Sequence, residues 1–218
     1  MNSQSNEPVV LKEAPNTLDG MFSYLNLQAS LAGYRGVLAQ AAKDDISHEE
    51  FLKRLLSQEA SSKFSRQIDC RLAQAKFPCI KTLEQFDWNH PTAIPKAKIL
   101  AAAELNFLSN REGFVFISEH GLGKTHLAIA VGYRAVLAGV RTCFTKAIDM
   151  VNHLSAAQAD HSTEKAMRFY TKPALLIIDE VGRLSIDQKQ GEHIFNVIDA
   201  RYERSSTILT TNRVFRDW

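Results

Sequence analysis

The stretch Ser118-Glu119-His120-Gly121-Leu122-Gly123-Lys124-Thr125 separates an apolar run from a helical one. The residues Gly113 to Ile117 before it have the composition of a buried strand, and His126 to Leu137 after it have the periodicity of a helix. A turn that carries Gly-Lys-Thr between a strand and a helix is typical of proteins that bind a nucleoside triphosphate. The backbone N–H groups of such a turn surround the phosphates, and the helix N-terminus adds unpaired donors.

This stretch, residues 118–125, is called the phosphate loop below. Within it, Lys124 is expected to reach the outer phosphates and the Thr125 hydroxyl to bind magnesium. The usual pattern, G-x-x-x-x-G-K-[ST], begins with glycine, whereas this chain has Ser118, where a positive φ would be strained because serine carries a Cβ atom. A chance Gly-Lys-Thr is the alternative, but the flanking strand and helix favour a nucleotide site. The residues predicted to contact the nucleotide are Ser118, Glu119, His120, Gly121, Leu122, Gly123, Lys124, Thr125 and His126.

A second signal is the run Ala174-Leu175-Leu176-Ile177-Ile178-Asp179-Glu180. An all-apolar run that ends in two carboxylates is typical of a central parallel strand, which presents acids at the sheet edge where such folds bind ligands. Asp179 is then the second anchor of the magnesium, and Glu180 is the general base that polarises the attacking water. An isolated Asp-Glu pair is weak evidence, but it is strong when Gly-Lys-Thr precedes it by one strand.

The strand-like residues 206–212 end in Asn212. If this strand lies beside that of Asp179, Asn212 can orient the lytic water against the γ-phosphate, as a third catalytic residue with Glu180 and Lys124. A turn-forming Asn after a strand is the commoner meaning of such a residue. In this context the sequence favours the catalytic role.

The composition indicates a globular protein of ordinary type. The 218 residues suffice for one α/β domain and a smaller appendage, and 45% of them are hydrophobic. The three cysteines lie far apart with no C-x-x-C pair, which argues against a zinc ribbon or a disulfide framework and favours the cytoplasm. No apolar run approaches the ~20 residues of a membrane span, so no membrane association is expected.

The periodicity divides the chain into four parts. Residues 1–16 are polar and predict a disordered tail, and residues 17–77 predict helices. The first two helices are expected to break near Gly33 or Gly36, and a capping box of Ser47 and Glu50 begins a long third helix. Residues 78–95 predict an extended linker, whose Phe86 and Trp88 could wall the nucleotide base or pack on the core. Residues 96–218 form the predicted nucleotide-binding core.

Within that core, the helical and strand-like stretches alternate. Helices are expected over residues 96–108, 148–157, 164–170 and 188–204, and a strand over 140–144, with Gly139 ending the helix that follows the phosphate loop. Helices that alternate with parallel strands predict a three-layer α/β sandwich, the fold class of P-loop nucleotide-binding proteins.

A charge bias marks the long helix of the N-terminal region. Between Phe51 and Lys81 there are seven basic and two acidic residues. Such an excess could follow a nucleic-acid backbone, where each neutralised phosphate adds affinity by counterion release. Most charge runs are solvated helix faces, and the composition alone favours that interpretation.

Together, these motifs resemble the IstB-like transposition helper ATPases, of the AAA+ class close to the DnaC helicase loaders. The resemblance runs from about Thr17 to the chain end, and its motifs are Leu83–Trp88, Gly123–Ala128, Leu176–Gly182, Arg201–Arg204 and Ser206–Arg213. It implies a protein that binds ATP and Mg²⁺, binds double-stranded DNA, forms homo-oligomers and assists its cognate transposase. A DnaC-like helicase loader and a non-hydrolysing adaptor that binds DNA through its basic helices are the alternatives.

Two departures from the family limit these expectations. Ser118-Glu119-His120 stands where the family usually has Gly-Pro-Pro, which predicts weaker nucleotide binding. The sequence also stops at Trp218, where the family continues with a C-terminal lid that supplies an arginine finger. We therefore expect ATP binding with poor or absent hydrolysis. Arg201 or Arg204 could act across an interface, but a surface helix arginine is the favoured interpretation.

Overall fold

The computed structural model describes residues 14–89, 94–182 and 188–213. The chain divides into two compact units, Met1–Gln67 and Ile68–Trp218, and the boundary falls inside the helix α3, His48–Ala75. The predicted tail, residues 1–16, lies mostly outside the described part. No helix in the described ranges is long and apolar enough to cross a membrane.

The first unit contains α1, Leu18–Tyr24, then α2, Gln28–Asp44, and the first part of α3. The predicted break near Gly33 or Gly36 is wrong, because both glycines lie inside α2. The break comes instead at Asn26, whose φ of 54° lies in the left-handed region that asparagine tolerates better than most residues.

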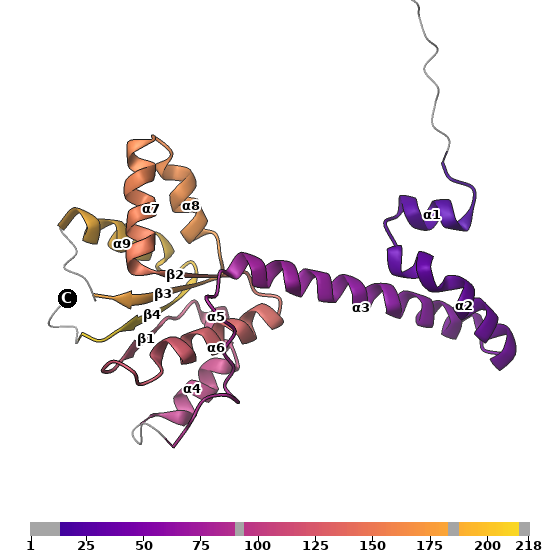
Figure 1. The fold of residues 1–218 in the computed structure, drawn as a ribbon, viewed down its shortest axis with the longest axis horizontal. Coiled ribbons are helices and arrows are strands. Elements are labelled where there is room, and N and C mark those ends of the chain that lie inside the picture. The colour runs from indigo at the N-terminus through magenta and orange to yellow at the C-terminus, as the bar shows by residue number, and fades with distance from the viewer. Residues whose placement is uncertain (1–13, 90–93, 183–187, 214–218) are drawn as a thin grey trace, which may run out of the picture. The chain divides into compact units, whose positions relative to one another are not determined.

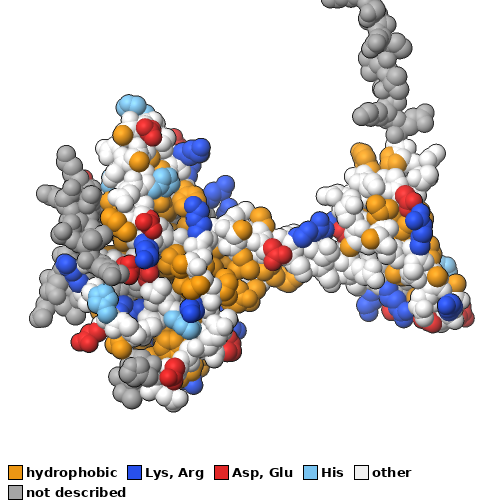
Figure 2. All heavy atoms as spheres, viewed as in Figure 1, with side chains coloured by type: hydrophobic (Ala, Val, Ile, Leu, Met, Phe, Trp, Pro, Cys, Tyr) orange, Lys and Arg blue, Asp and Glu red, His pale blue; other side chains and the backbone are white. Residues whose placement is uncertain are grey.

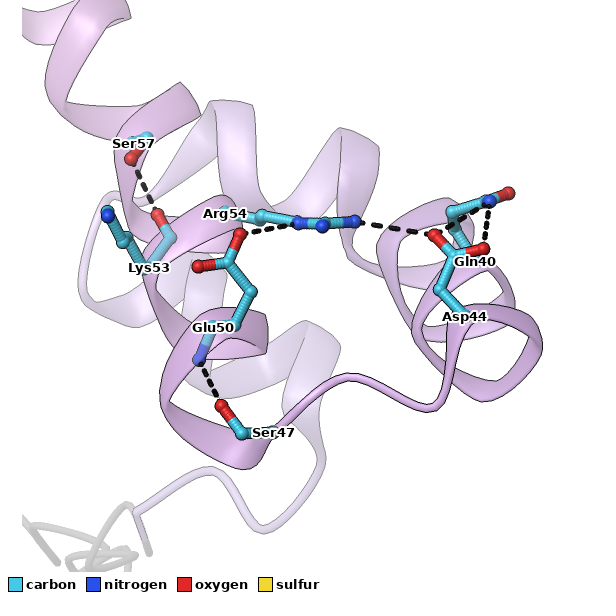
Figure 3. A network of polar contacts seen from close by, with 7 residues as sticks. All are labelled: Gln40, Asp44, Ser47, Glu50, Lys53, Arg54 and Ser57. Atoms are coloured by element: carbon cyan, nitrogen blue, oxygen red, sulfur yellow. Dashed lines mark hydrogen bonds and ion pairs between the residues drawn. The ribbon is translucent and has the colours of Figure 1, made fainter.

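The predicted start of α3 is confirmed by its cap. The Glu50 backbone N–H donates to Ser47 Oγ at 3.2 Å, which satisfies one of the unpaired donors of the first turn. The Arg54 guanidinium then contacts both Glu50, at 2.8 Å, and Asp44 at the end of α2, at 3.5 Å (Figure 3). Because these side chains are partly exposed, their ion pairs contribute little to the stability of the fold. Their main effect is to orient the turn between α2 and α3.

The second unit is built on a parallel sheet with helices on both faces (Figure 1). The strands are β1, Phe114–Ile117; β2, Thr142–Lys146; β3, Leu175–Val181; and β4, Ser206–Thr211, in the order β1-β4-β3-β2. One face carries α4, Lys96–Ala103; α5, Asn106–Asn110; and α6, Lys124–Leu137. The other carries α7, Ala147–Ala159; α8, Thr163–Thr171; and α9, Gln188–Arg201. The predicted three-layer α/β sandwich is confirmed.

The centre of this unit is β3, whose apolar run is buried on both faces. On one face Leu176 and Ile178 pack with α7, and on the other Leu175 and Ile177 pack with α6. By contrast, β1 is not the buried strand that its composition predicts, because Val115 and Ile117 are each 38% exposed. It lies at the end of the strand order, so one face of it is only partly covered.

Two further boundaries depend on backbone conformation. The helix expected over residues 96–108 is divided into α4 and α5 by Leu105, whose φ is 66°. Gly139 follows the end of α6 with a φ of 85°, and its N–H donates to the Val136 carbonyl at 2.9 Å, as the sequence predicts for a helix C-terminus. The break at Leu105 could not be predicted from the residue type in the same way, because leucine rarely adopts a positive φ.

Candidate nucleotide-binding site

The phosphate loop joins β1 to α6 at the carboxyl edge of the sheet, beside the ends of β3 and β4. Gly121 and Gly123 have φ values of 78° and 80°, a conformation that glycine adopts at little cost. Ser118 does not adopt a positive φ, so the strain expected at the missing glycine does not arise. Its N–H instead donates to the Thr211 carbonyl at 3.4 Å and extends the sheet.

The Lys124 ammonium lies inside the curve of the loop. It donates to the carbonyls of Ser118, at 2.7 Å, and Glu119, at 2.6 Å. Burial lowers the pKa of Lys124, and the charge of Asp179 opposes this shift. The ammonium is therefore held at the loop by two main-chain carbonyls, which phosphate oxygens could replace.

Opposite the loop, Asp179 joins α6 to β4. Its Oδ1 accepts hydrogen bonds from the hydroxyl of Thr125, at 2.8 Å, and from that of Thr210. A carboxylate and a hydroxyl in contact are the hard oxygen donors that Mg²⁺ prefers, so this pair fits the ion. In the described part of the chain no group of three or more His, Cys, Asp or Glu could hold a metal. A magnesium ion here would therefore need oxygens from a nucleotide as well.

Glu180 follows Asp179 at an irregularity of β3, with a φ of 59°. Its backbone N–H donates to Thr210 Oγ1 at 2.9 Å, and its carboxylate pairs with Lys146 of β2 at 3.4 Å. The irregularity turns Glu180 away from the regular side-chain alternation of the strand. The candidate base is thus held by a cation at the same sheet edge.

The sequence analysis missed Thr210 and Lys146. Each is a polar residue at the carboxyl end of a strand that neighbours β3. Their position at the carboxyl end of a strand was the signal that could have identified them, because the carboxyl ends of parallel strands meet at one edge of the sheet. Once Asp179 is placed there, the last polar residues of β2 and β4 are expected to surround it.

The predicted position of Asn212 beside the strand of Asp179 is confirmed, since β4 lies between β1 and β3. The Asn212 side-chain nitrogen lies 2.9 Å from His120 Nε2, which connects the end of β4 to the phosphate loop. These residues line a cleft of about 310 Å³, together with Gly121, Gly123, Lys124, Thr125, Glu180, Thr210 and Thr211. Most of the predicted site residues are thus brought to one cleft.

Four predicted nucleotide contacts lie around that cleft and not on its walls. Ser118 and Leu122 line a separate apolar groove of about 420 Å³ between β1 and α4. Glu119 contributes its carbonyl to Lys124, and His126 Nε2 lies 2.8 Å from the Thr82 carbonyl. Their contacts with a nucleotide remain predictions.

Phe86 packs against the phosphate loop from the core side. A Cβ atom on Gly123 would come within 2.5 Å of the Phe86 ring, so only glycine fits there. Phe86 is buried with Leu83, Ile99 and Leu127, and its ring centroid lies 5.2 Å from that of His126. The sequence left two roles open for Phe86, a wall for the nucleotide base or packing on the core, and the structure shows it packed in the core.

Arg201 is not a surface residue, as the sequence analysis favoured, and it is not available to a neighbouring subunit. It is 1% exposed and donates to the carbonyls of Tyr170, Pro173 and Ser206. Burial lowers its pKa to about 10, so it stays charged at neutral pH. Helical periodicity could not reveal this role, because the carbonyl partners of Arg201 lie in other segments of the chain.

The model of the family "IstB-like ATP binding protein" matches residues 21–218. The chain belongs to this family. An ATP-binding protein of insertion sequence IS5376 from Geobacillus stearothermophilus is 36% identical over 89% of this chain and 77% of its own length. One of insertion sequence IS21 from Pseudomonas aeruginosa is 34% identical over 92% of this chain and 76% of its own. The IstB-like resemblance inferred from the motifs is confirmed.

Solved structures support the fold. AMPPCP-bound DnaA from Aquifex aeolicus has a TM-score of 0.54 and 26% identity, over 61% of this chain and 42% of that one. The DnaC helicase loader has a TM-score of 0.51 and 24% identity, over 62% of this chain and 78% of that one. This chain is therefore an ATP-binding protein of the insertion-sequence type with an AAA+ fold.

Proposed function

We propose that this chain is an ATP-dependent, DNA-binding helper of a transposase, and that it binds ATP with Mg²⁺ at the carboxyl edge of the sheet. The contact between Thr125 and Asp179 carries this proposal. It places a hydroxyl and a carboxylate together at the edge of the cleft that Lys124 and Asn212 line. The cytoplasm is the proposed location.

Each residue of the cleft has a role in binding or orientation. The Lys124 ammonium exchanges its carbonyl partners for β- and γ-phosphate oxygens. Thr125 and Asp179 hold the magnesium ion, which when bound neutralises charge on the phosphates. Thr210 keeps the Asp179 carboxylate oriented through its hydroxyl, and Lys146 holds Glu180 until water and nucleotide are in place.

The relatives support the proposed partners. Proteins named for their insertion sequences are 31–36% identical to this chain over about nine-tenths of its length. One structural neighbour, a DnaA bound to AMPPCP and single-stranded DNA, is 26% identical. These likenesses support DNA and a transposase as partners. A homo-oligomer on double-stranded DNA is the working assembly that we propose.

The decisive experiment measures ATP binding and ATP turnover separately, with and without duplex DNA. Lys124→Ala is expected to weaken binding of a non-hydrolysable ATP analogue about 100-fold, because two charge-assisted hydrogen bonds to phosphate are lost. The control is Lys165→Ala, an exposed lysine of α8 away from the cleft. Equal affinities of the wild type and Lys124→Ala would refute the nucleotide part of the proposal.

Turnover separates the remaining functions. We expect weak hydrolysis, and vigorous DNA-stimulated turnover would exclude the alternative of a non-hydrolysing adaptor. A helicase loader would capture a replicative helicase in a pull-down, whereas a transposition helper captures a transposase. The higher identity to the insertion-sequence proteins than to the DnaC loader favours the second result.

A further inference from the structure

The amino edge of the sheet carries a separate cleft of about 350 Å³, lined by apolar surface with basic side chains around it. Five basic residues line it: Arg71 on α3, Lys76 just after α3, Arg141 just before β2, Arg168 on α8 and Lys172 just after α8. All five belong to the second unit. We call this feature the amino-edge cleft.

The positive charges of this cleft have few partners. Arg168 pairs with Glu164 at 2.7 Å, but both side chains are more than 70% exposed, so the pair contributes little. Among the residues that the structure describes, the other four basic side chains form no ion pair. Lys76 lies 4.5 Å from the centroid of the Phe169 ring, which fixes its ammonium at the cleft wall.

Within the part of the chain that the structure describes, no acidic residue lines the cleft. Cys143 lies at its floor, and burial raises the pKa of that thiol to about 11, so it adds no negative charge at neutral pH. Figure 2 shows Lys and Arg side chains following α8 on the viewed face of this unit. The cleft therefore concentrates positive charge without compensation from its own walls.

We propose that the amino-edge cleft binds the phosphodiester backbone of DNA. Its cations come from three separate parts of the chain, so they suit several successive phosphates better than one ion. Each neutralised phosphate releases condensed counterions and adds affinity. The proposal rests on the DNA binding proposed above and assigns it to named residues that the nucleotide site does not use.

The two clefts lie at opposite ends of β2. Arg141 precedes its first residue, and Lys146, which contacts Glu180, is its last. At about 3.3 Å per residue, these ends are about 15 Å apart. DNA phosphates in the amino-edge cleft therefore do not compete with ATP, and both ligands can be bound at once.

The test is the salt dependence of duplex binding, measured by fluorescence anisotropy on the full chain between 50 and 200 mM salt. In the double variant Arg141→Gln/Lys172→Gln, the slope of log affinity against log salt is expected to fall by about 1.8, or 0.9 for each lost phosphate contact. Affinity at the lowest salt is expected to fall at least about tenfold. A wild-type slope in this variant would overturn the proposal.

Two controls isolate the position of the charges. Lys98→Gln/Lys165→Gln removes the same charge from exposed lysines outside the cleft and is expected to change the slope by less than half as much. Arg141→Lys/Lys172→Arg keeps the charge and is expected to keep the slope. If the double variant does not fold, each single variant is expected to lower the slope by about 0.9.

Other outcomes have distinct meanings. Competition by inorganic phosphate that is lost in the variant, with an unchanged DNA slope, would make free phosphate the ligand and overturn the DNA assignment. Unchanged binding of an ATP analogue to the variant is expected and keeps the nucleotide site separate. A wild-type chain that binds no DNA would refute the proposed function itself, whereas a normal wild type with an insensitive variant would refute only the cleft.

Discussion

Lys124 and Arg201 are both cations that donate to main-chain carbonyls, yet they serve different purposes. Lys124 binds two carbonyls of a loop that lines an open cleft. Arg201 is buried and binds carbonyls from the segment after α8 and from β4. Ligand oxygens can take the place of the carbonyls that bind Lys124. If Arg201 released its carbonyls, they would remain buried without a hydrogen-bond donor. A cation whose partners a ligand can exchange indicates a functional role, whereas a cation with fixed partners indicates a structural role.

The largest effect is therefore expected from Arg201→Met. It leaves several buried carbonyls without a donor, and the free energy of unfolding is expected to fall by at least about 3 kcal/mol in urea denaturation. Arg204→Met is the matched control, because its side chain is exposed and its effect should stay within about 0.5 kcal/mol. Similar stabilities of the two variants would break the comparison.

Lys124→Ala is expected to show the reverse pattern. Its carbonyl partners belong to Ser118, which is half-buried, and Glu119, which is exposed, so water can replace the ammonium and the free energy of unfolding should fall by less than about 1 kcal/mol. The same variant should lose about 100-fold in nucleotide affinity, as stated above. A loss of stability as large as that of Arg201→Met would show that Lys124 is a structural residue.

Asn212→Ala sharpens the functional side of the comparison. If Asn212 orients the lytic water, ATP turnover should fall roughly tenfold or more while binding of a non-hydrolysable analogue stays near that of the wild type. A control substitution at the neighbouring Thr211 would disturb the core, because that residue is buried. Asn212→Ser is therefore the better control for effects on the backbone. Equal turnover in all three proteins would leave Asn212 as a turn residue.

The smallest effect on stability is expected from Glu59 in the first unit. Like Arg201, it is a buried charged side chain with fixed partners, but it is an anion. Its Oε2 accepts from the Ser30 N–H at 3.0 Å, and this hydrogen bond lowers its pKa below 4.5. A lowered carboxyl pKa stabilises the fold above about pH 4.5, and this contribution is lost as the pH falls through the lowered pKa. Glu59→Gln should flatten that acid dependence in thermal melts followed by circular dichroism between pH 3 and 7.

Much of the second unit could be predicted from sequence. The alternation of apolar runs with helical periodicity gave the sandwich, and Gly-Lys-Thr with Asp179 located the cleft, because such motifs combine local conformation with chemistry. Asn26 and Leu105 were not predicted as breaks, since a positive φ at a residue other than glycine is set by surrounding packing. Arg201 was missed for a related reason: its partners come from segments about 30 residues earlier.

The basic run of α3 illustrates the same limit. Lys63 and Arg66 both approach Glu59, at 3.8 and 3.6 Å, and Arg54 is held by Glu50. Part of the charge excess is therefore used within the first unit, which agrees with the solvated-face interpretation for those residues. Arg71 and Lys76, from the same run, line the amino-edge cleft instead. Composition could not separate the two groups because it contains no tertiary contacts.

The insertion of β4 between β1 and β3 has a consequence for synthesis in the cell. Strand β1 pairs with β4 and with no other described strand, and β4 comes about 90 residues later in the chain. At a translation rate of 5–20 residues per second, β1 waits roughly 5–20 s for its partner. During this interval the apolar residues of β1 have no partner strand, and the sheet of the described strands is complete only when β4 has emerged.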